Sequence, residues 1–402
     1  MAGEARRLII LGATGSIGAQ TVEVVRALAA GGGEAGRTAP IEIVGLAAGS
    51  SLDALCALGD ELGVGELALA DGAGARASAH VRTGPDAAER LVREVECDIV
   101  MGAIVGAAGL GATLAAVELG RDIALANKET LVAAGEIVVP AAHRSGARLL
   151  PVDSEHSAIW QCLTGLGAEP WPPMSTPACV RKVTLTASGG PFRSWPADRI
   201  ARATPAEALN HPTWTMGPKV TIDSASLMNK ALELIEAHWL FGLLPQQLDI
   251  LVHPQSIVHA LVEHVDGSVI AQLGAPDMRC PIQYALTFPD RSAGPAPKLD
   301  LARAGRLDFV RPDYDVFPAP LGAMRVMERG GAAGAIFNAA NEAAVEAFLA
   351  GAIAFGRIGQ LALGALDALA DPAPQVGSLA DVRAADAEAR RWVAGEIGVA
   401  AG

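Results

Sequence analysis

Aromatic side chains are scarce in this chain of 402 residues: Phe, Trp and Tyr make up only 4% of it, whereas 51% of its residues are hydrophobic. The buried cores must therefore be filled mainly by Ala, Val, Leu and Ile, and alanine-rich helices should pack closely. At roughly 100–200 residues per domain, the length predicts two or three domains.

Positive charge is also in short supply. The chain has 31 Lys and Arg against 44 Asp and Glu, a formal net charge of −13. Nucleic acid normally requires a basic surface, so we expect no such partner. A phosphorylated substrate is compatible with this balance, because one local cationic pocket is enough to bind it.

Cysteine is rare, with five residues and no pair in C-x-x-C spacing. An odd number without that spacing argues against a disulfide framework and against a zinc–thiolate site. We therefore expect a reducing compartment, the cytoplasm. A catalytic thiol is the alternative to the usual role of a small buried hydrophobe.

Hydrophobic runs long enough for a membrane are interrupted by glycine. Ile99–Val117 carries no charge over 19 residues, but its four glycines divide it into a strand, a loop and a helix. Arg6 and Arg7 precede an apolar run in the manner of a signal peptide, yet Gly12 ends that run, which indicates a strand entering a turn. We expect no membrane association.

Strand and helix patterns alternate through residues 1–150. Strands are predicted at Arg7–Leu11, Ile41–Ala47, Asp98–Ile104 and Asp122–Ala126, a helix at Ser16–Ala29, and a glycine-rich loop at Gly31–Pro40. This alternation is typical of a parallel α/β sheet, so we predict an α/β, Rossmann-like N-terminal domain that binds NADPH over residues 1–150.

The pattern changes after residue 150. Strands are predicted at Lys182–Thr186, Ser256–Val262 and Val269–Leu273, the last two around an Asp266-Gly267 turn, and a helix at Ala225–Leu240. These elements indicate an α+β catalytic domain over residues 151–288. A proline-rich linker over 289–320 and a small C-terminal α-helical bundle over 321–402 follow.

Three glycines, Gly12, Gly15 and Gly18, stand between the first strand and the first helix. Glycines there let the backbone approach a pyrophosphate at the positive end of the helix dipole. A glycine trio alone is weak evidence for a nucleotide site, because a plain tight turn can also contain it. Its position between a strand and a helix near the N-terminus favours dinucleotide binding. The second strand ends in Gly49-Ser50-Ser51 without a carboxylate, which favours NADP, although no Lys or Arg stands there either.

Two groups of polar residues could bind a metal. Asp153 and Glu155 follow a short apolar run and share one side of an extended segment. Asn229, Lys230 and Glu233 share one face of the predicted helix. Oxygen-rich ligation suits Mg²⁺ or Mn²⁺. The alternatives are a solvated acidic pair or helix cap for the first group, and an ordinary Lys–Glu surface pair for the second.

Other residues are candidates for a phosphate site and a lid. Ser188 precedes Gly189-Gly190, whose backbone N–H groups can form an anion nest. His211 begins a weakly periodic segment that carries Trp214 and Met216. We interpret that segment as a lid that excludes water from the substrate, with a structural histidine as the alternative.

Eight motifs in succession resemble those of the 1-deoxy-D-xylulose 5-phosphate reductoisomerase family. They are Gly-Ala-Thr-Gly-Ser-Ile-Gly (12–18), Ala-Asn-Lys-Glu-Thr-Leu-Val (126–132), Pro-Val-Asp-Ser-Glu-His (151–156), Thr-Ala-Ser-Gly-Gly-Pro-Phe (186–192), His-Pro-Thr-Trp-Thr-Met-Gly (211–217), Asp-Ser-Ala-Ser-Leu-Met-Asn-Lys (223–230), His-Pro-Gln-Ser (253–256) and Phe-Asn-Ala-Ala-Asn-Glu (337–342). They occur in the family's order over essentially the whole chain, and together they are specific, although no single one is.

The resemblance implies a role for each matching residue. NADPH would contact Thr14, Gly15, Ser16, Ile17, Gly49, Asn127, Glu129 and Gly217. The divalent metal would bind Asp153, Glu155 and Glu233, and the substrate's reacting oxygens would meet Lys128, Ser154 and Glu155. The substrate's phosphate end would be held by Ser188, His211, Ser224, Asn229 and Lys230, under a flap, residues 211–217, that carries Trp214. The residues expected to be catalytic are Lys128, Asp153, Glu155, His211 and Glu233.

The implied reaction is the NADPH-dependent isomerisation and reduction of 1-deoxy-D-xylulose 5-phosphate to 2-C-methyl-D-erythritol 4-phosphate, for isoprenoid precursors, by a homodimer. Ser50-Ser51 depart from the Lys-Asn pair of many relatives, and Ala231 replaces a common Gly. The hairpin at 255–273 is expected near the dimer interface. A different NAD(P) dehydrogenase, for instance one acting on an amino-acid semialdehyde, and a non-catalytic nucleotide sensor are the two rival classes.

Overall fold

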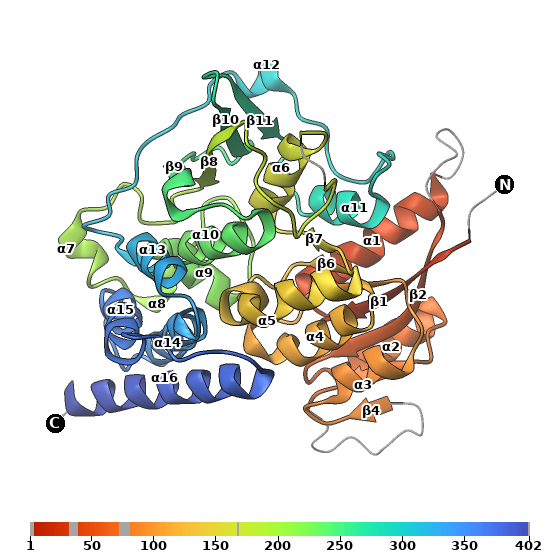
Figure 1. The fold of residues 1–402 in the computed structure, drawn as a ribbon, viewed down its shortest axis with the longest axis horizontal. Coiled ribbons are helices and arrows are strands. Elements are labelled where there is room, and N and C mark those ends of the chain that lie inside the picture. Colours follow the sequence, from red (N-terminus) through yellow and green to blue (C-terminus); the bar gives the residue numbers. More distant parts are fainter. Residues whose placement is uncertain (1–3, 32–38, 72–80, 167–168, 401–402) are drawn as a thin grey trace.

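The computed structural model describes residues 4–31, 39–71, 81–166 and 169–400, so most of the predicted Gly31–Pro40 loop lies outside the described residues. Figure 1 shows a large sheet with its helices at the N-terminal end, a smaller sheet beside it, and a group of helices formed by the C-terminal part. The last helix lies along the edge of the molecule that carries the C-terminus (Figure 1).

The larger sheet has seven parallel strands in the order β4-β3-β2-β1-β5-β6-β7. The strands are β1 (Arg6–Leu11), β2 (Ile41–Ala48), β3 (Leu67–Leu69), β4 (Val81–Thr83), β5 (Ile99–Gly102), β6 (Asp122–Leu125) and β7 (Leu149–Pro151). Residues 8–11 of β1 are completely buried, as expected for a strand covered on both faces. The predicted α/β class of this region is confirmed.

Five helices connect these strands: α1 (Ser16–Ala30), α2 (Leu52–Leu62), α3 (Ala87–Glu94), α4 (Leu110–Glu118) and α5 (Glu129–Ser145). The strand order reverses between β1 and β5, which flank a crevice at the carboxyl ends of the strands. Ligands of open parallel sheets bind in such a crevice. β5 ends at Gly102, two residues before the predicted end at Ile104, and a short 3-10 helix, η1 (Gly106–Gly109), follows it.

The smaller sheet has four strands in the order β11-β10-β8-β9: β8 (Val180–Ala187), β9 (Leu248–Val252), β10 (Val258–His264) and β11 (Val269–Leu273). β10 and β11 form the predicted antiparallel hairpin. Gly267 has φ +85°, a conformation that glycine adopts without strain in a tight turn. α6 (Ser154–Leu163) packs against β10 and β11, and α11 (Arg279–Thr287) packs against α1.

The helix predicted over Ala225–Leu240 is present, but it begins three residues later than predicted. The structure has α9 (Pro218–Ala225) and α10 (Met228–Phe241), separated by Ser226 and Leu227. Leu227 has φ +57°, which breaks the helical path, and its side chain is only 4% exposed. Burial of this side chain offsets the strain of a left-handed backbone, an effect that local sequence patterns do not report.

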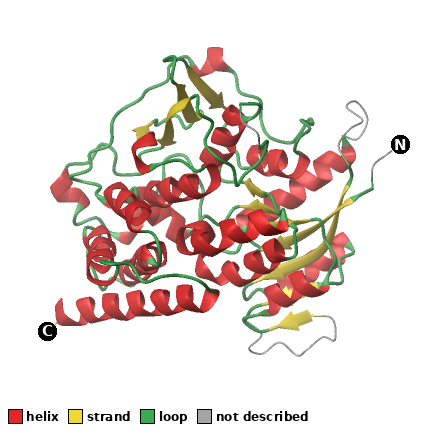
Figure 2. Cartoon of the chain, viewed as in Figure 1, coloured by secondary structure: helices red, strands yellow, loops and turns green. Residues whose placement is uncertain are grey.

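The segment 289–320 runs over the surface with one short helix, α12 (Leu301–Ala304), and a single β-bridge from Val310 to Val252. The C-terminal helices are α13 (Ala319–Arg329), α14 (Ala333–Leu349), α15 (Arg357–Leu369) and α16 (Leu379–Ala400). α14 packs on α5, and α13 packs on α10, so the helical part supports two of the helices that carry site residues (Figure 2). In the described part of the chain, no helix is long and apolar enough to cross a membrane.

Candidate active site

A cavity of about 910 Å³ lies where the large sheet meets the smaller sheet and the helices α9 and α10. Most residues selected from the sequence line it: Gly15, Ser16, Ile17, Asn127, Lys128, Glu129, Asp153, Ser154, Glu155, Ser188, Trp214, Gly217, Ser224, Asn229, Lys230 and Glu233. Thr14, Gly49 and His211 are not among the lining residues.

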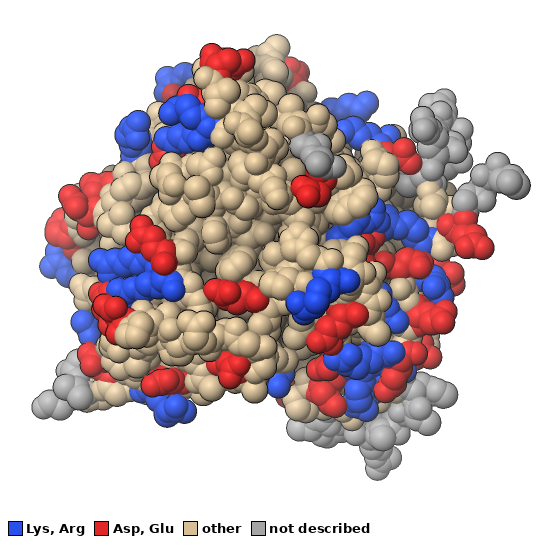
Figure 3. All heavy atoms as spheres, in the orientation of Figure 1, with Lys and Arg blue, Asp and Glu red and all other residues tan. Residues whose placement is uncertain are grey.

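On the face of the molecule shown in Figure 3, acidic and basic side chains alternate around an uncharged centre, and no continuous basic patch is visible among the residues drawn.

The glycine turn after β1 forms one end of the cavity. Gly12 has φ +84°, and a Cβ there would lie 2.5 Å from the carbonyl oxygen of Ala103. A Cβ on Gly18 would lie 2.4 Å from the carbonyl oxygen of Gly12, so this glycine lets α1 pack directly on the turn. Gly15 is the N-cap of α1 and is exposed. The N–H groups of the first turn are therefore available to an anion such as a pyrophosphate.

Asn127 and Glu129 are engaged within the protein. The side-chain amide of Asn127 donates to the carbonyl oxygens of Ile104 at 2.5 Å and Gly106 at 2.9 Å, so it holds the loop between β5 and η1. The carboxylate of Glu129 accepts a bond of 2.6 Å from Nζ of Lys219. Gly49 is exposed at the tip of β2, where an added Cβ would meet nothing within 4 Å. This tip is therefore open to a ligand.

Three carboxylates, Asp153, Glu155 and Glu233, form the metal cluster, with one oxygen of each within 4.8 Å of the others. Asp153 is the N-cap of α6 and Glu155 lies in its first turn, so the predicted extended segment is wrong. Asp153 occupies the N-cap position without a side-chain cap hydrogen bond, because its carboxylate pairs with Lys128 instead. Glu233 comes from α10 and is 1% exposed, which excludes the alternative of an ordinary surface pair.

Two lysines pair with these carboxylates and offset part of their charge. Nζ of Lys128 lies 2.9 Å from Oε1 of Glu233 and 3.0 Å from Oδ1 of Asn229, and also pairs with Asp153. Nζ of Lys230 pairs with both Glu155 and Glu233. Burial alone would lower the pKa of each lysine, but the neighbouring carboxylates outweigh it and raise the pKa of both.

Three carboxylates and two ammonium groups leave one formal negative charge in a largely buried cluster. Burial, and then the charge of Glu155, raise the pKa of Glu233. A divalent cation would relieve both effects, since oxygen-rich clusters of this kind are what Mg²⁺ and Mn²⁺ prefer. The donor set present therefore fits a hard divalent cation.

His211 does not line the cavity itself but contacts the hydroxyls of two serines that do. Its Nε2 lies 3.0 Å from Oγ of Ser188 and 3.1 Å from Oγ of Ser224. Its Nδ1 accepts the backbone N–H groups of Thr213, at 3.1 Å, and Trp214, at 2.9 Å, so the proton of the neutral ring is on Nε2. Burial, and then Arg193, lower the pKa of His211. The ring therefore shapes the flap and orients two candidate phosphate ligands.

The flap has neither helix nor strand and ends at Gly217, the N-cap of α9. Its Trp214 is half-buried and lines the cavity. Ser188 also accepts the N–H of Gly190 at 3.2 Å, so one donor of the predicted anion nest is already used. The hydroxyls of Ser188 and Ser224 also line this part of the cavity and are candidate ligands for the phosphate.

Some lining residues were not predicted. Lys219 bonds to Glu129 and, at 2.9 Å, to Asp223, which in turn accepts a bond of 2.9 Å from Asn341 of α14. Arg279, at the start of α11, pairs with Glu23 of α1 at 3.2 Å. Lys219 follows Gly217 closely and could have been found from that motif. Arg279 and Glu23 are 256 residues apart, so no local pattern pairs them.

The chain matches three family models. They are 1-deoxy-D-xylulose 5-phosphate reductoisomerase over residues 8–135, the C-terminal domain of that enzyme over residues 149–241, and the DXP reductoisomerase C-terminal domain over residues 273–392. The 1-deoxy-D-xylulose 5-phosphate reductoisomerase of Symbiobacterium thermophilum is 47% identical over 395 residues, which cover 95% of this chain and 96% of that protein.

Two solved structures are similar over nearly their whole length. The 1-deoxy-D-xylulose 5-phosphate reductoisomerase of Zymomonas mobilis in complex with NADPH has a TM-score of 0.84 and 39% identity, and covers 98% of this chain and 99% of its own. A DOX-P reductoisomerase in complex with NADPH, fosmidomycin and magnesium has a TM-score of 0.85 and 37% identity, and covers 98% of both chains.

Proposed function

The chain belongs to the 1-deoxy-D-xylulose 5-phosphate reductoisomerase family, and on this premise we propose that the family's reaction takes place in the cavity described above. The enzyme is an NADP- and divalent-metal-dependent oxidoreductase that converts 1-deoxy-D-xylulose 5-phosphate to 2-C-methyl-D-erythritol 4-phosphate with NADPH. The observation that carries the residue assignment is the convergence of the glycine turn and the metal cluster on one cavity.

The metal cluster would hold Mg²⁺ or Mn²⁺ through Asp153, Glu155 and Glu233. When bound, the cation supplies Lewis-acid stabilisation of negative charge on the substrate's oxygens. Lys128 already reaches both Asp153 and Glu233, so its ammonium group stands beside any oxygen held there and adds a second positive charge. Ser154, at the first position of α6, would donate its hydroxyl to the same oxygens. These roles support Lys128 and the three carboxylates as the catalytic group.

The cofactor would lie along the glycine turn, with its pyrophosphate at residues 14–17 and its 2′-phosphate at Gly49-Ser50. Bound NADPH supplies the hydride. Gly217, Asn127 and Glu129 line the same cavity as the turn and the metal cluster, which supports them as contacts of the cofactor's reacting end.

The phosphate of the substrate would bind to Ser188, Ser224, Asn229 and Lys230. His211 contributes by orienting the two serine hydroxyls, which is a narrower role than direct contact. Closure of the flap, with Trp214 over the cavity, would exclude water from the hydride transfer. Hydrogen exchange at residues 211–217 should slow when NADPH and a phosphonate analogue bind, and unchanged exchange would count against a lid.

The cellular setting follows from the same premise. We assign the enzyme to isoprenoid precursor biosynthesis in the cytoplasm, with Mn²⁺ as an alternative to Mg²⁺. The division into a nucleotide domain (1–150), a catalytic domain (151–288), a linker (289–320) and a helical domain (321–402) belongs to the same proposal.

A homodimer is supported by the β10–β11 hairpin. β11 is an edge strand, and Val265, Val269 and Ile270 are 67%, 54% and 43% exposed. Exposed apolar residues on an edge strand favour pairing with a second copy. Light scattering at micromolar concentration should give twice the chain mass, and a monomer would refute the dimer.

One assay tests the function. The full chain, stripped with EDTA, is mixed with NADPH and 1-deoxy-D-xylulose 5-phosphate, with and without added Mn²⁺ or Mg²⁺. NADPH should be consumed only when both the sugar phosphate and the metal are present. Consumption that survives EDTA, or that proceeds with an amino-acid semialdehyde instead, would favour another dehydrogenase.

A further inference from the structure

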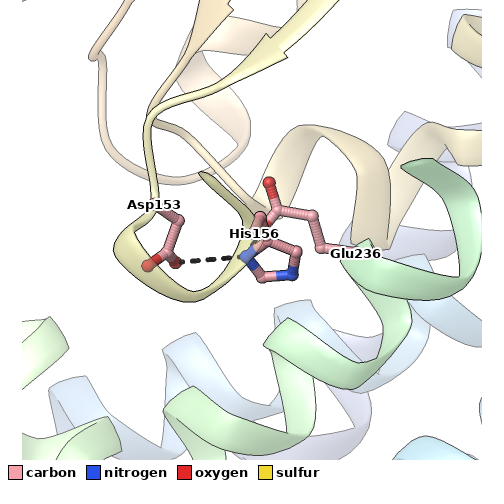
Figure 4. A group of neighbouring side chains, drawn as sticks. All are labelled: Asp153, His156 and Glu236. Carbon is pink, nitrogen blue, oxygen red and sulfur yellow. Dashed lines mark ion pairs between the residues drawn. The ribbon is translucent and has the colours of Figure 1, made fainter. Parts of the chain in front are cut away.

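A second group of ionisable side chains lies next to the metal cluster and does not line the cavity. His156 of α6 and Glu236 of α10 are both 0% exposed, and Figure 4 shows them converging with Asp153. Nδ1 of His156 lies 3.9 Å from Asp153 and 3.3 Å from Oε2 of Glu236. Nothing in the mechanism above uses Glu236.

The hydrogen-bond geometry limits what this group can be. Nε2 of His156 lies 2.8 Å from the backbone carbonyl oxygen of Glu233, and because a carbonyl only accepts, Nε2 carries a hydrogen. Within the described residues, three atoms of the pair have no hydrogen-bond partner: both carboxylate oxygens of Glu236 and Nδ1 of His156. An unpaired charge with no exposure would be costly, so one proton must lie between Oε2 and Nδ1. The pair is then neutral whichever atom carries that proton.

The pair connects the two helices that supply the metal cluster. His156 is in the first turn of α6, next to Glu155 and three residues after Asp153, and its other nitrogen holds the backbone of Glu233. We propose that Glu236 is a positioning residue: through His156 it fixes the backbone of Glu233 relative to the start of α6, and so sets the spacing of the three carboxylates. This inference rests on the proposed metal-binding role of those carboxylates.

A second cation is the competing explanation. One ligand atom from each of Asp153, His156 and Glu236 lies within 4.8 Å of the others. Against it, the side chains of His156 and Glu236 are sealed from the cavity and from solvent. A shared proton pairs Nδ1 of His156 with Oε2 of Glu236 without an additional ion.

The test compares Glu236→Leu with Glu236→Gln in the full chain, with Mn²⁺ alone as the probe. A glutamine can donate its amide N–H to Nδ1 of His156 and keep the contact, whereas leucine fills the space without one. Partners of metal ligands are worth about 10- to 100-fold in metal affinity, so Glu236→Leu should weaken Mn²⁺ binding by roughly that factor. Glu236→Gln should restore most of the wild-type affinity.

Calorimetry gives the affinity and the stoichiometry, and thermal unfolding is followed in parallel. Thr287→Val, which removes a buried hydroxyl from α11, is the matched control: it should lower stability and leave Mn²⁺ affinity unchanged. If Glu236→Leu changes only the unfolding temperature, the residue is merely structural and the inference is wrong. Two Mn²⁺ ions per wild-type chain, one of them lost in Glu236→Leu, would overturn it in favour of a second cation. Wild-type Mn²⁺ affinity in Glu233→Gln would instead overturn the assignment of the metal cluster itself.

Discussion

The two ends of the cavity, the glycine turn and the metal cluster, differ in the groups that line them: backbone at the first and charged side chains at the second. At the glycine turn the surface is backbone: Gly12 and Gly18 leave no room for a Cβ, and Gly15 exposes the start of α1. At the metal cluster the surface is charged side chains, three carboxylates and two lysines, all largely buried. A backbone site should tolerate changes of charge and fail with changes of volume, whereas the ionic site should do the reverse.

The largest expected effect is at the ionic end. Glu233→Gln keeps the volume and removes the charge that Lys128 and Lys230 share. Because even outer partners of metal ligands are worth about 10- to 100-fold, losing a ligand should lower turnover by at least about 100-fold. NADPH affinity should stay within a few-fold of wild type.

Glu136→Gln is the matched control for that charge removal. Glu136 lies on α5 away from the cavity and accepts the N–H of Gly331 at 2.9 Å, which a glutamine oxygen can also do. Its steady-state kinetics should be unchanged. Near-normal turnover of Glu233→Gln at limiting Mn²⁺ would break the comparison, because the ionic end would then not depend on its charge.

The next effect is at the backbone end. Gly12→Ala puts a Cβ 2.5 Å from the carbonyl oxygen of Ala103 in a left-handed conformation. Strain of about 1–3 kcal/mol should lower NADPH affinity about 10-fold or more. Mn²⁺ affinity should not change. Gly65→Ala, where an added Cβ meets nothing within 4 Å, is the control and should bind NADPH normally. Fluorescence titration with NADPH measures both variants, and equal affinities would contradict the steric account.

A smaller effect, on the preference for NADPH over NADH, is expected at the tip of β2, where both backbone and side-chain groups are exposed. Gly49 and Ser50 are exposed, and in the proposed cofactor site they would offer a hydroxyl and N–H groups to the 2′-phosphate. Two charge-assisted bonds, discounted for solvent, favour NADPH over NADH by about 10- to 100-fold. Ser50→Asp should lower or invert this ratio of catalytic efficiencies. A ratio that does not move would show that the 2′-phosphate binds elsewhere.

The smallest effect is a titration. Because burial and Arg193 lower the pKa of His211, the folded protein binds this proton less readily than the unfolded chain. The stability contribution of this group should therefore fall as the pH drops from about 6.5 through the folded-state pKa. Protonation also removes the Nδ1 acceptor from Thr213 and Trp214. An NMR titration of the ring should give a midpoint below 6.5, and one at or above that value would contradict the hydrogen-bond assignment.

The difference between the glycine turn and the metal cluster also explains what could be predicted from the sequence. The glycine turn is local, so the spacing of Gly12, Gly15 and Gly18 and the adjoining strand and helix were enough to locate it. The hairpin around Asp266-Gly267 was local too, and is confirmed. Lys128 and Glu233 are 105 residues apart, and their contact depends on how α5 and α10 pack. The family's motifs could name these residues, but no pattern within either helix shows that they meet.

The errors have physical causes of the same kind. The break between α9 and α10 is invisible in the hydrophobic pattern, because Leu227 is apolar, as a residue of a continuous helix would be, although its backbone is left-handed and its side chain is buried. Glu155 was placed on an extended segment because the apolar run of β7 precedes it closely, whereas α6 already begins at Ser154. Both errors lie at element boundaries, where tertiary packing outweighs local propensity.

The central claim is that one cavity joins a backbone cofactor site to an ionic metal site, and a crossed binding experiment tests it most directly. NADPH and Mn²⁺ affinities are measured separately on Gly12→Ala and on Glu233→Gln. The account predicts that Gly12→Ala loses NADPH affinity and keeps Mn²⁺ affinity, and that Glu233→Gln does the opposite. Loss of both affinities in either folded variant, or of neither in both, would contradict it.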